Sequence, residues 1–339
     1  MISRTGWPQR SNAKAASGAA DRLAHDSLRR FAADVRDGLA QRDQKRLPSK
    51  YLYDALGSAL FEAICHLPEY GLTRAEERLL GRHALELSRR IPAPAVVAEL
   101  GSGSGRKTRN LLRALASGRE LVYRPIDISP ASLGRCRREL SELPRVRVLA
   151  IEGEYLDGLL EVASKRPAPG PLLVLFLGST IGNLDRPATL AFLRQVRALL
   201  RTGDALLLGA DLMKDPQALL AAYDDALGVT AAFNRNLIVR LNRELGADCD
   251  PLWFEHLALY NHAERRIEMH LATKEARRLR IAGAGVDVPL GPGETIWTES
   301  CHKFSLGELD RLAVRAGFRS EAQWIDEEWP FADCLWVAD

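Results

Sequence analysis

The glycine-rich stretch VVAELGSGSGRKTRNLL has the residue types of a nucleotide-binding loop, because it follows an apolar run and precedes a helical pattern. Both common phosphate-binding motifs, the P-loop and the dinucleotide fingerprint, require glycine at position 106. That position is Arg106, so neither motif is complete. Gly101, Gly103 and Gly105 still allow the backbone to approach a ligand closely, but they do not indicate a phosphate.

S-adenosylmethionine suits such a loop, because its charged part is an amino-acid tail and a sulfonium rather than a phosphate. The next predicted strand, YRPID, ends at Asp127, where the paired hydroxyls of a ribose would lie. One strand later, Glu154 and Tyr155 offer a polar edge and an aromatic face to an adenine ring. A structural alternative is that the glycines form a plain turn and Asp127 caps a turn or helix. The predicted cofactor site comprises Gly101, Ser102, Gly103, Lys107, Asp127, Glu154 and Tyr155.

The charge of the chain bears on the class of its partner. Among 339 residues, 47 Lys and Arg nearly balance 44 Asp and Glu, and the two signs are interspersed, unlike the basic surface of a nucleic-acid-binding protein. No apolar run approaches the roughly 18 residues of a membrane span, and the N-terminus lacks the apolar stretch of a secretory signal. We expect a cytoplasmic monomer whose partner is a small molecule, not nucleic acid or a membrane.

The cysteines and histidines indicate neither a disulfide framework nor a metal site. The five cysteines are far apart and form no C-x-x-C pair. The seven histidines, including His270 and His302, do not cluster with carboxylates or cysteines at metal-ligand spacing. We therefore expect a reducing compartment and no metal.

These candidate residues need a framework of alternating strands and helices. Apolar runs such as AVVAEL, ELVYRPID, PLLVLFLGS and DALLLGAD are separated by helical patterns such as RPATLAFLRQVRALL. This alternation predicts an α/β fold with a doubly wound parallel sheet and helices on both faces. Between about residues 215 and 298 the alternation lapses, which predicts an inserted second unit. The segment SEAQWIDEEWPFADCLWVAD predicts a closing antiparallel pair.

The segment before the sheet is predicted to be helical. DSLRRFAADVRDGLAQR has apolar residues at helical spacing, with Asp26 as the helix cap. Further on, a capping box from Thr73 to Glu76 predicts the start of another helix. The apolar stripe of the first helix comprises Leu28, Phe31, Ala32, Val35 and Leu39.

Several long segments, in the same order, resemble the S-adenosylmethionine-dependent L-histidine Nα-methyltransferases of ergothioneine biosynthesis. The resemblance runs from about Lys50 to the C-terminus, through YLYDALGSALFEAICHLPEYGLTRAE, ELGSGSGRKTRNLL, FLGSTIGNL, YDDALGVTAAFNRN, NRELGADCD, ERRIEMHL and TESCHKF. It implies that the protein methylates the α-amino group of L-histidine three times, giving trimethylhistidine (hercynine), with S-adenosylmethionine as cofactor.

The resemblance also implies a class I, Rossmann-like methyltransferase domain joined to a smaller α+β substrate domain. The substrate-binding domain would comprise residues 22–74 and 214–302, from an N-terminal segment and an insert. The methyltransferase domain would comprise residues 75–213 and 303–339. Residues 1–21 are expected to form a disordered tail.

The site residues of the family carry over by motif. Asn183 of IGNL and Tyr223 of AYDD would hold the substrate carboxylate. Tyr70 of PEY and Glu299 of WTES would contact the imidazole. Tyr53 of YLYD would lie beside the amine as the catalytic residue.

Two further positions concern the side-chain pocket of the substrate. Met269 of IEMH would help to form it. Cys301 stands two positions after Glu299, where the family usually places a serine that contacts the imidazole. Cysteine is a weaker hydrogen-bond partner, so this departure bears on the recognition of histidine more than on the reaction type.

The residue types themselves suit this chemistry. A buried carboxylate such as Glu299 accepts a hydrogen bond from an imidazole and disfavours substrates that would leave it unpaired. Asn183 and Tyr223 donate to a carboxylate without adding a full positive charge near the sulfonium. Each residue has a structural alternative: a turn for Asn183, helix packing for the tyrosines, and an exposed strand carboxylate for Glu299.

Methyl transfer requires a neutral amine in line with the methyl group and sulfur, so positioning should dominate the rate. We expect Tyr53 to orient the amine and to help its proton depart. Two other functions stay open: an Nα-methyltransferase for another amino acid such as tryptophan, and a non-catalytic S-adenosylmethionine-binding protein. Glu299 and Met269 argue against the first, whereas the intact glycines, Asp127 and Asn183 argue against the second.

Overall fold

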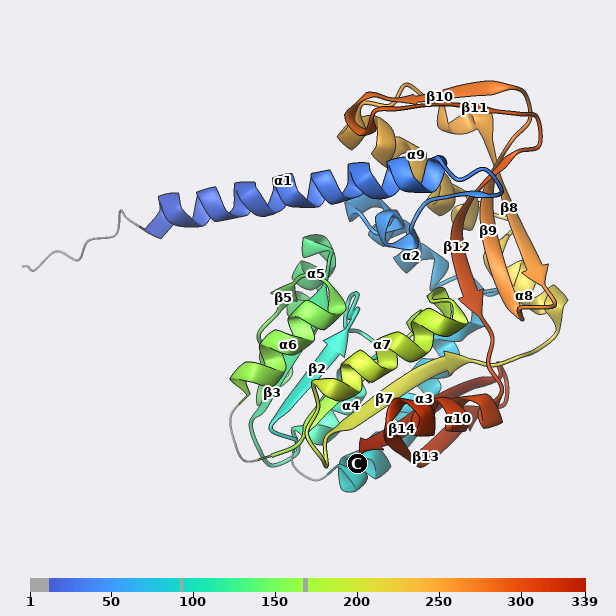
Figure 1. Cartoon of the computed structure of the whole chain (residues 1–339). Helices are drawn as coiled ribbons and strands as arrows, with labels where there is room; N and C mark the ends of the chain where they lie inside the picture. The colour runs from blue at the N-terminus through green and yellow to red at the C-terminus, as the bar shows by residue number, and fades with distance from the viewer. Residues whose placement is uncertain (1–11, 92–93, 167–169) are drawn as a thin grey trace, which may run out of the picture.

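The computed structural model describes residues 12–91, 94–166 and 170–339, with side chains from His25 onward (Figure 1). In Figure 1 the chain forms two parts, a larger lower part and a smaller upper part, each built around its own sheet. None of the helices in these ranges is long and apolar enough to cross a membrane.

The larger sheet is the predicted doubly wound sheet. Its eight strands are β2 (Val96–Leu100), β3 (Leu121–Asp127), β4 (Val146–Val148), β5 (Ile151–Glu152), β6 (Leu172–Phe176), β7 (Ala205–Asp211), β13 (Phe318–Asp326) and β14 (Phe331–Ala338). The order is β13-β14-β7-β6-β2-β3-β4, with β5 paired to β3. Strands β2 to β7 pair in parallel, and the predicted closing pair β13–β14 joins β7 antiparallel. The strand order reverses between β2 and β6, which is where such sheets bind ligands.

Helices cover both faces of this sheet. They are α3 (Gly71–Arg90), α4 (Arg109–Leu115), α5 (Pro130–Leu140), α6 (Tyr155–Lys165), α7 (Arg186–Ala198) and α10 (Leu306–Ala316). Helices α3, α4 and α5 share a core with Val97 and Leu207, whereas α6, α7 and α10 share one with Val96 and Leu206. Because successive strand residues point to opposite faces, burial of both faces explains the continuous apolar runs.

The predicted insert forms most of a second sheet. Its strands are β1 (Lys45–Arg46), β8 (Phe254–Asn261), β9 (Arg266–Thr273) and β12 (Thr295–His302), in the order β1-β12-β9-β8. β1 pairs in parallel with β12, and the other pairs are antiparallel. A separate hairpin joins β10 (Arg277–Ile281) to β11 (Val286–Leu290). The N-terminal segment and the insert therefore share one sheet.

The remaining helices support this second sheet and link it to the first. They are α1 (Asn12–Leu39), α2 (Ala55–Ile64), α8 (Pro216–Tyr223) and α9 (Val229–Leu245), with 3-10 turns η1 (Ser49–Leu52), η2 (Thr180–Asn183), η3 (Pro251–Trp253) and η4 (Ala282–Ala284). Turn η2 follows β6 of the larger sheet and packs against β12 of the smaller one. It therefore joins the two parts directly beside the predicted site.

Helix α1 begins earlier than the sequence predicts. Phe31, Val35 and Leu39 are buried along one face, in agreement with the predicted stripe. The helix starts at Asn12 and continues through Asp26, so Asp26 is not its cap. The alanine-rich stretch NAKAASGAAD explains the extension, because alanine has the highest helix propensity.

This extension also bears on the expected tail of residues 1–21. Residues 1–11 lie outside the described residues, whereas residues 12–21 belong to α1. The other domain boundaries remain predictions. Strands β1 and β8 to β12 fall within 22–74 and 214–302, and the strands of the larger sheet fall within 75–213 and 303–339.

Candidate active site

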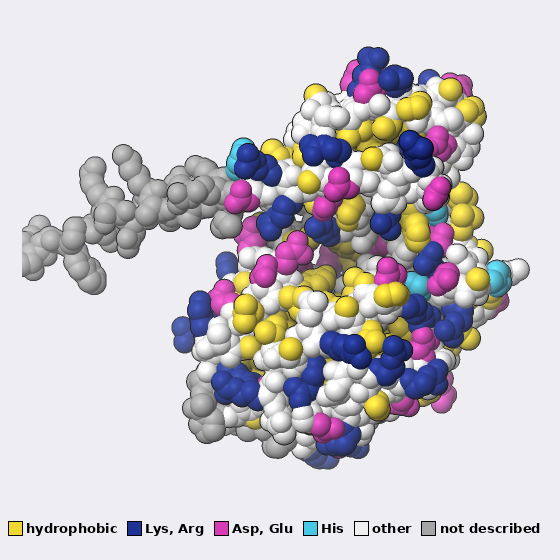
Figure 2. All heavy atoms as spheres, viewed as in Figure 1, with side chains coloured by type: hydrophobic (Ala, Val, Ile, Leu, Met, Phe, Trp, Pro, Cys, Tyr) yellow, Lys and Arg dark blue, Asp and Glu magenta, His cyan; other side chains and the backbone are white. Residues whose placement is uncertain are grey.

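A cavity of about 630 Å³ opens where the two parts of the chain meet. Loops at the carboxyl ends of β2, β3 and β6 line one side, and α2, η1 and β12 line the other. Figure 2 shows hydrophobic side chains gathered around the hollow between the upper and lower parts, with charged groups at its rim. All of the predicted site residues except Met269 line this cavity.

The glycine loop has a backbone that needs glycine. Gly101 and Gly103 have φ angles of 75° and 53°, which side chains disfavour. A Cβ atom on Gly101 would also lie 3.0 Å from the hydroxyl of Tyr155. Ser102 is buried, and its hydroxyl has no hydrogen-bond partner among the described residues. A buried, unpaired hydroxyl beside loop backbone that lines the cavity fits a polar ligand.

Asp127 lies at the end of β3, next to this loop. Its Oδ2 accepts a hydrogen bond from the Gly103 N–H at 3.1 Å, and its Oδ1 accepts one from the Ser129 N–H at 2.9 Å. Burial raises the pKa of Asp127 above its ordinary value, although these two bonds act in the opposite direction. The carboxylate is thus held rigidly at the cavity wall.

An aromatic group forms the adjoining wall. Tyr155 meets Phe176 and Phe192 edge-on, with ring centroids 5.6 and 6.4 Å apart. Phe192 lines the cavity but was not predicted as a site residue, because its position in α7 reads as ordinary helix packing. Glu154 precedes α6, and its carboxylate lies 3.8 Å from the Lys50 ammonium of η1. This contact joins the two parts at the cavity mouth.

Lys107 lines the cavity, but its charge is already paired. Its ammonium lies 2.6 Å from Glu76 Oε2, and Glu76 Oε1 accepts a hydrogen bond from the Gly178 N–H at 2.7 Å. Burial lowers the pKa of Lys107, but Glu76 and Glu99 together raise it above the ordinary value.

The predicted capping box from Thr73 to Glu76 is wrong, because α3 already begins at Gly71. Glu76 is instead a buried link between the glycine loop and the segment after β6.

Glu299 is a buried carboxylate on the opposite side of the cavity. Only 9% of the residue is exposed, and burial raises its pKa to about 7. Its Oε1 accepts hydrogen bonds from the Tyr53 hydroxyl at 3.4 Å and from the Asn183 amide at 3.3 Å. A β-bulge interrupts the β9–β12 register between Trp297 and Glu299, and the Trp297 indole donates to the Glu299 backbone oxygen at 2.9 Å. The bulge and the indole fix the backbone that carries the carboxylate.

Three tyrosines add hydroxyl groups to this side. The rings of Tyr70 and Tyr223 meet edge-on at 6.0 Å, and the ring of Tyr53 lies 5.5 Å from those of Phe61 and Phe233. Burial raises the pKa of each of the three tyrosines well above its usual value. Their hydroxyls therefore keep their protons at neutral pH and can donate hydrogen bonds.

The cavity thus combines a glycine loop without a phosphate motif and a buried carboxylate ringed by hydroxyl and amide donors. The sequence profile of the histidine-specific, S-adenosylmethionine-dependent methyltransferases matches residues 31–338. The chain belongs to this family. The match includes both sheets and every residue of the predicted site.

Individual members of the family are similar over nearly the whole chain. Histidine N-alpha-methyltransferase of Mycolicibacterium smegmatis is 42% identical over 322 residues, which cover 94% of this chain and 97% of that protein. Histidine N-alpha-methyltransferase of Mycobacterium tuberculosis is 40% identical over 309 residues, covering 91% and 94%. Ergothioneine biosynthesis protein 1 of Neurospora crassa is 31% identical over 287 residues, covering 83% of this chain and 32% of that protein.

S-adenosylmethionine, the methyl donor of this family, fits the loop side of the cavity. Gly101 and Gly103 allow close approach, and Ser102 offers an unpaired hydroxyl. Asp127 and Tyr155 offer the carboxylate and the aromatic ring expected for a ribose and an adenine. Their assignment as cofactor ligands remains a prediction.

Met269 does not line the cavity, unlike the other residues predicted to contact substrate. It lies on β9 opposite Glu299 and is packed into the hydrophobic core. Its predicted pocket role is therefore not supported, because the core around β9 takes up its side chain. Cys301 does line the cavity.

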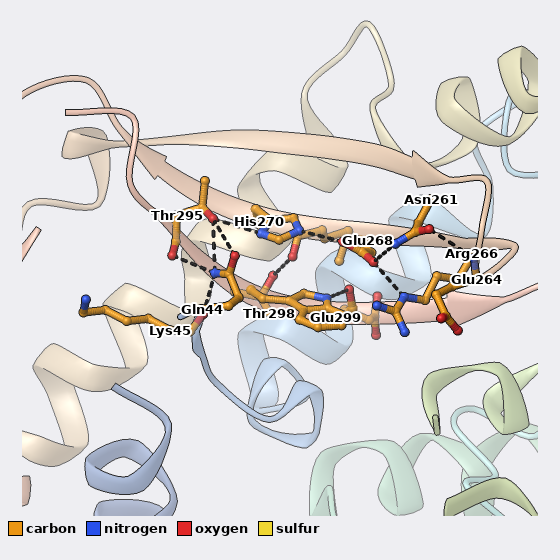
Figure 3. Close-up of polar contacts among 12 residues, drawn as sticks. Gln44, Lys45, Asn261, Glu264, Arg266, Glu268, His270, Thr295, Thr298 and Glu299 are labelled. Carbon is orange, nitrogen blue, oxygen red and sulfur yellow. Dashed lines mark hydrogen bonds and ion pairs between the residues drawn. The ribbon is translucent and has the colours of Figure 1, made fainter. Parts of the chain in front are cut away.

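A polar network runs along β9 and β12 behind Glu299 (Figure 3). Glu268 accepts a hydrogen bond from Arg266 at 2.7 Å and lies 3.3 Å from His270, which lies 3.2 Å from Thr295. Burial lowers the pKa of His270, which favours its neutral form. No group of three His, Cys, Asp or Glu within the described ranges is arranged to hold a metal. This network supports the strand that carries Glu299.

Sequence reasoning missed Lys303 in the quoted segment TESCHKF. Lys303 is fully buried behind Tyr223 and Cys301, just after β12. Residues two apart in a strand point to the same face of the sheet. The spacing of Glu299, Cys301 and Lys303 could therefore have indicated that Lys303 lies on the same side as the predicted site.

Proposed function

We propose that this protein transfers methyl groups from S-adenosylmethionine to the α-amino group of L-histidine, three times, giving trimethylhistidine. The observation that carries this proposal is the buried carboxylate of Glu299, which shares one cavity with the glycine loop. An imidazole has an N–H to donate to that carboxylate, whereas most amino-acid side chains would leave it unpaired. Membership of the family supports the same reaction.

The residues around Glu299 suit the two ends of the substrate. Asn183 and Tyr223 would donate hydrogen bonds to the substrate carboxylate, and Tyr70 would contact the imidazole together with Glu299. In this structure the Asn183 amide donates to Glu299. We expect substrate binding to break this bond, because both groups then find partners on histidine.

Bound S-adenosylmethionine would supply an electrophilic methyl group, so the remaining task of the protein is to present a neutral amine in line with it. Tyr53 would orient that amine. Because burial raises the pKa of Tyr53 well above its usual value, its hydroxyl would act as a hydrogen-bonding group and not as a phenolate base. The proton of the amine would then leave to water.

The site of methylation tests this proposal. Purified protein is incubated with L-histidine and S-adenosylmethionine labelled with ¹³C in the methyl group, and the product is analysed by NMR. With S-adenosylmethionine in excess, we expect three labelled methyl groups on the α-nitrogen, with no label on the ring nitrogens. Label on the ring, or none at all, would contradict the proposal.

We also propose that the protein acts as a monomer in the cytoplasm. Five free cysteines, four of them buried, support a reducing compartment. Sedimentation of the purified protein tests the oligomeric state, and a stable dimer would contradict it.

A further inference from the structure

A buried ionic cluster lies directly behind the proposed position of the substrate carboxylate. Its centre is Asp211, the last residue of β7, which is fully buried. The Lys303 ammonium lies 2.8 Å from Asp211 Oδ2, and the Lys214 ammonium lies 2.5 Å from Oδ1. The Trp329 indole also donates to Oδ1 at 3.0 Å. Two ammonium groups therefore share one carboxylate away from water.

The charges of this cluster do not cancel. Burial lowers the pKa of Lys303, but Asp211 and Cys301 raise it above the ordinary value, so Lys303 stays charged. Burial lowers the pKa of Lys214 to about 8, which still leaves it mostly charged at neutral pH. Glu299 also interacts with Lys303, and burial raises the pKa of Glu299 to about 7. An anion bound beside this cluster would balance the excess positive charge.

Lys303 also determines the direction of the Tyr223 hydroxyl. Its ammonium donates to Tyr223 Oη at 3.2 Å and to Cys301 Sγ at 3.2 Å. An ammonium has no acceptor, so the Tyr223 oxygen must accept this bond and its own proton is left for another acceptor. Cys301 sulfur is a weak acceptor, whereas a carboxylate in the cavity would be a strong one.

We propose that Lys303 is the positioning residue for the substrate carboxylate: it turns the Tyr223 hydroxyl proton toward the cavity and holds a buried positive charge behind it. Lys303 does not line the cavity, so it acts through Tyr223. This inference rests on the proposed function. The sequence indicates that neutral donors alone hold the substrate carboxylate. The inference places a full positive charge behind these donors.

The test compares two substrates that differ only in the carboxylate. Steady-state kinetics are measured with L-histidine and with L-histidinamide for the wild type and for Lys303→Met. We expect the variant to raise KM for histidine about 10- to 100-fold, the range for a lost hydrogen bond to a charged group. KM for histidinamide and for S-adenosylmethionine should change by less than about threefold. An equal rise for histidine and histidinamide would overturn the inference.

The matched control is Lys214→Met. Lys214 pairs with the same carboxylate, that of Asp211. Its second hydrogen bond goes to the Leu212 backbone oxygen and not to Tyr223. We expect its KM for histidine to rise less than that of Lys303→Met, because Lys214→Met loses the excess charge but keeps the hydrogen bond from Lys303 to Tyr223. In a double-mutant cycle, Lys303→Met should add little to Tyr223→Phe, because one residue acts through the other. Additive effects, or an effect of Lys214→Met equal to that of Lys303→Met, would overturn the inference.

Folding of the variants is checked by thermal unfolding. If Lys303→Met does not fold because Asp211 loses a partner, the variant Lys303→Met with Asp211→Asn removes both members of the pair. It should show the same selective loss for histidine, and an unchanged KM would overturn the inference. Absence of histidine methylation by the wild type would instead overturn the proposed function and the inference with it.

Discussion

Glu299 is a carboxylate whose ionisation is disfavoured until a partner arrives. Burial raises its pKa to about 7, and its hydrogen bonds to Tyr53 and Asn183 are long, at 3.4 and 3.3 Å. An imidazole N–H would provide a closer partner. This one side chain therefore connects the architecture of the cavity to the choice of substrate.

The raised pKa of Glu299 predicts a pH-dependent stability. The folded-state pKa of about 7 exceeds the ordinary value of about 4.3. The contribution of the protonated Glu299 to the free energy of unfolding is therefore full below about pH 4.3 and is lost as pH rises through about 7. Glu299→Gln removes this loss. The unfolding free energy of the variant minus that of wild type should therefore increase by about 2 to 3 kcal/mol from pH 5 to pH 8.

The measurement is urea unfolding of ligand-free protein at both pH values. Glu327→Gln is the control, since Glu327 is exposed in the turn between β13 and β14. The control should show no such change. A difference between Glu299→Gln and wild type that is the same at both pH values would contradict the raised pKa.

Tyr53→Phe tests the role of the hydroxyl that faces Glu299. The ring packing against Phe61 and Phe233 is kept, so we expect the fold to be unchanged. Loss of the orienting hydrogen bond should lower kcat about 10- to 100-fold and change the dissociation constant of histidine less. Single-turnover kinetics and calorimetry measure the two quantities. Unchanged turnover would remove Tyr53 from the mechanism.

The strands and loops were more predictable from the sequence than the hydrogen-bond partners of individual residues within them. Apolar runs predicted the parallel sheet and the closing hairpin, because burial on both faces leaves a continuous signal. The bulge between Trp297 and Glu299 leaves no such signal. Glu76 was misread as a helix cap because its partners, Lys107 and Gly178, are distant in the sequence.

The glycine loop after β2 gives a prediction of its own. Gly105 has a φ of 73°, and a Cβ atom there would lie 2.7 Å from Cys136 Sγ of α5. Gly118 has a φ of 78° but has no atom within 4 Å of the same position. Gly105→Ala should therefore cost about 1 to 3 kcal/mol more unfolding free energy than Gly118→Ala. Chemical denaturation compares them, and equal losses would show that close packing on α5 is unimportant.

The whole molecule places its chemistry at a junction that no local pattern describes. One hydrophobic core runs from α1 and α9 of the smaller part to α3 and α4 of the larger part, so the two sides of the cavity share a common support. The family resemblance predicted which residues meet there, because it carries long-range information. Lys303 and Phe192 were missed because each reads locally as an ordinary strand-end or helix residue.

Mass spectrometry of a competition reaction tests the central claim, histidine methylation in this cavity, most directly. Purified protein is incubated with S-adenosylmethionine and an equimolar pool of the twenty amino acids. We predict that histidine alone gains methyl groups, up to three. Methylation of a different amino acid would show that the pocket around Cys301 has another substrate, and methylation of none would contradict the assignment of an enzymatic function.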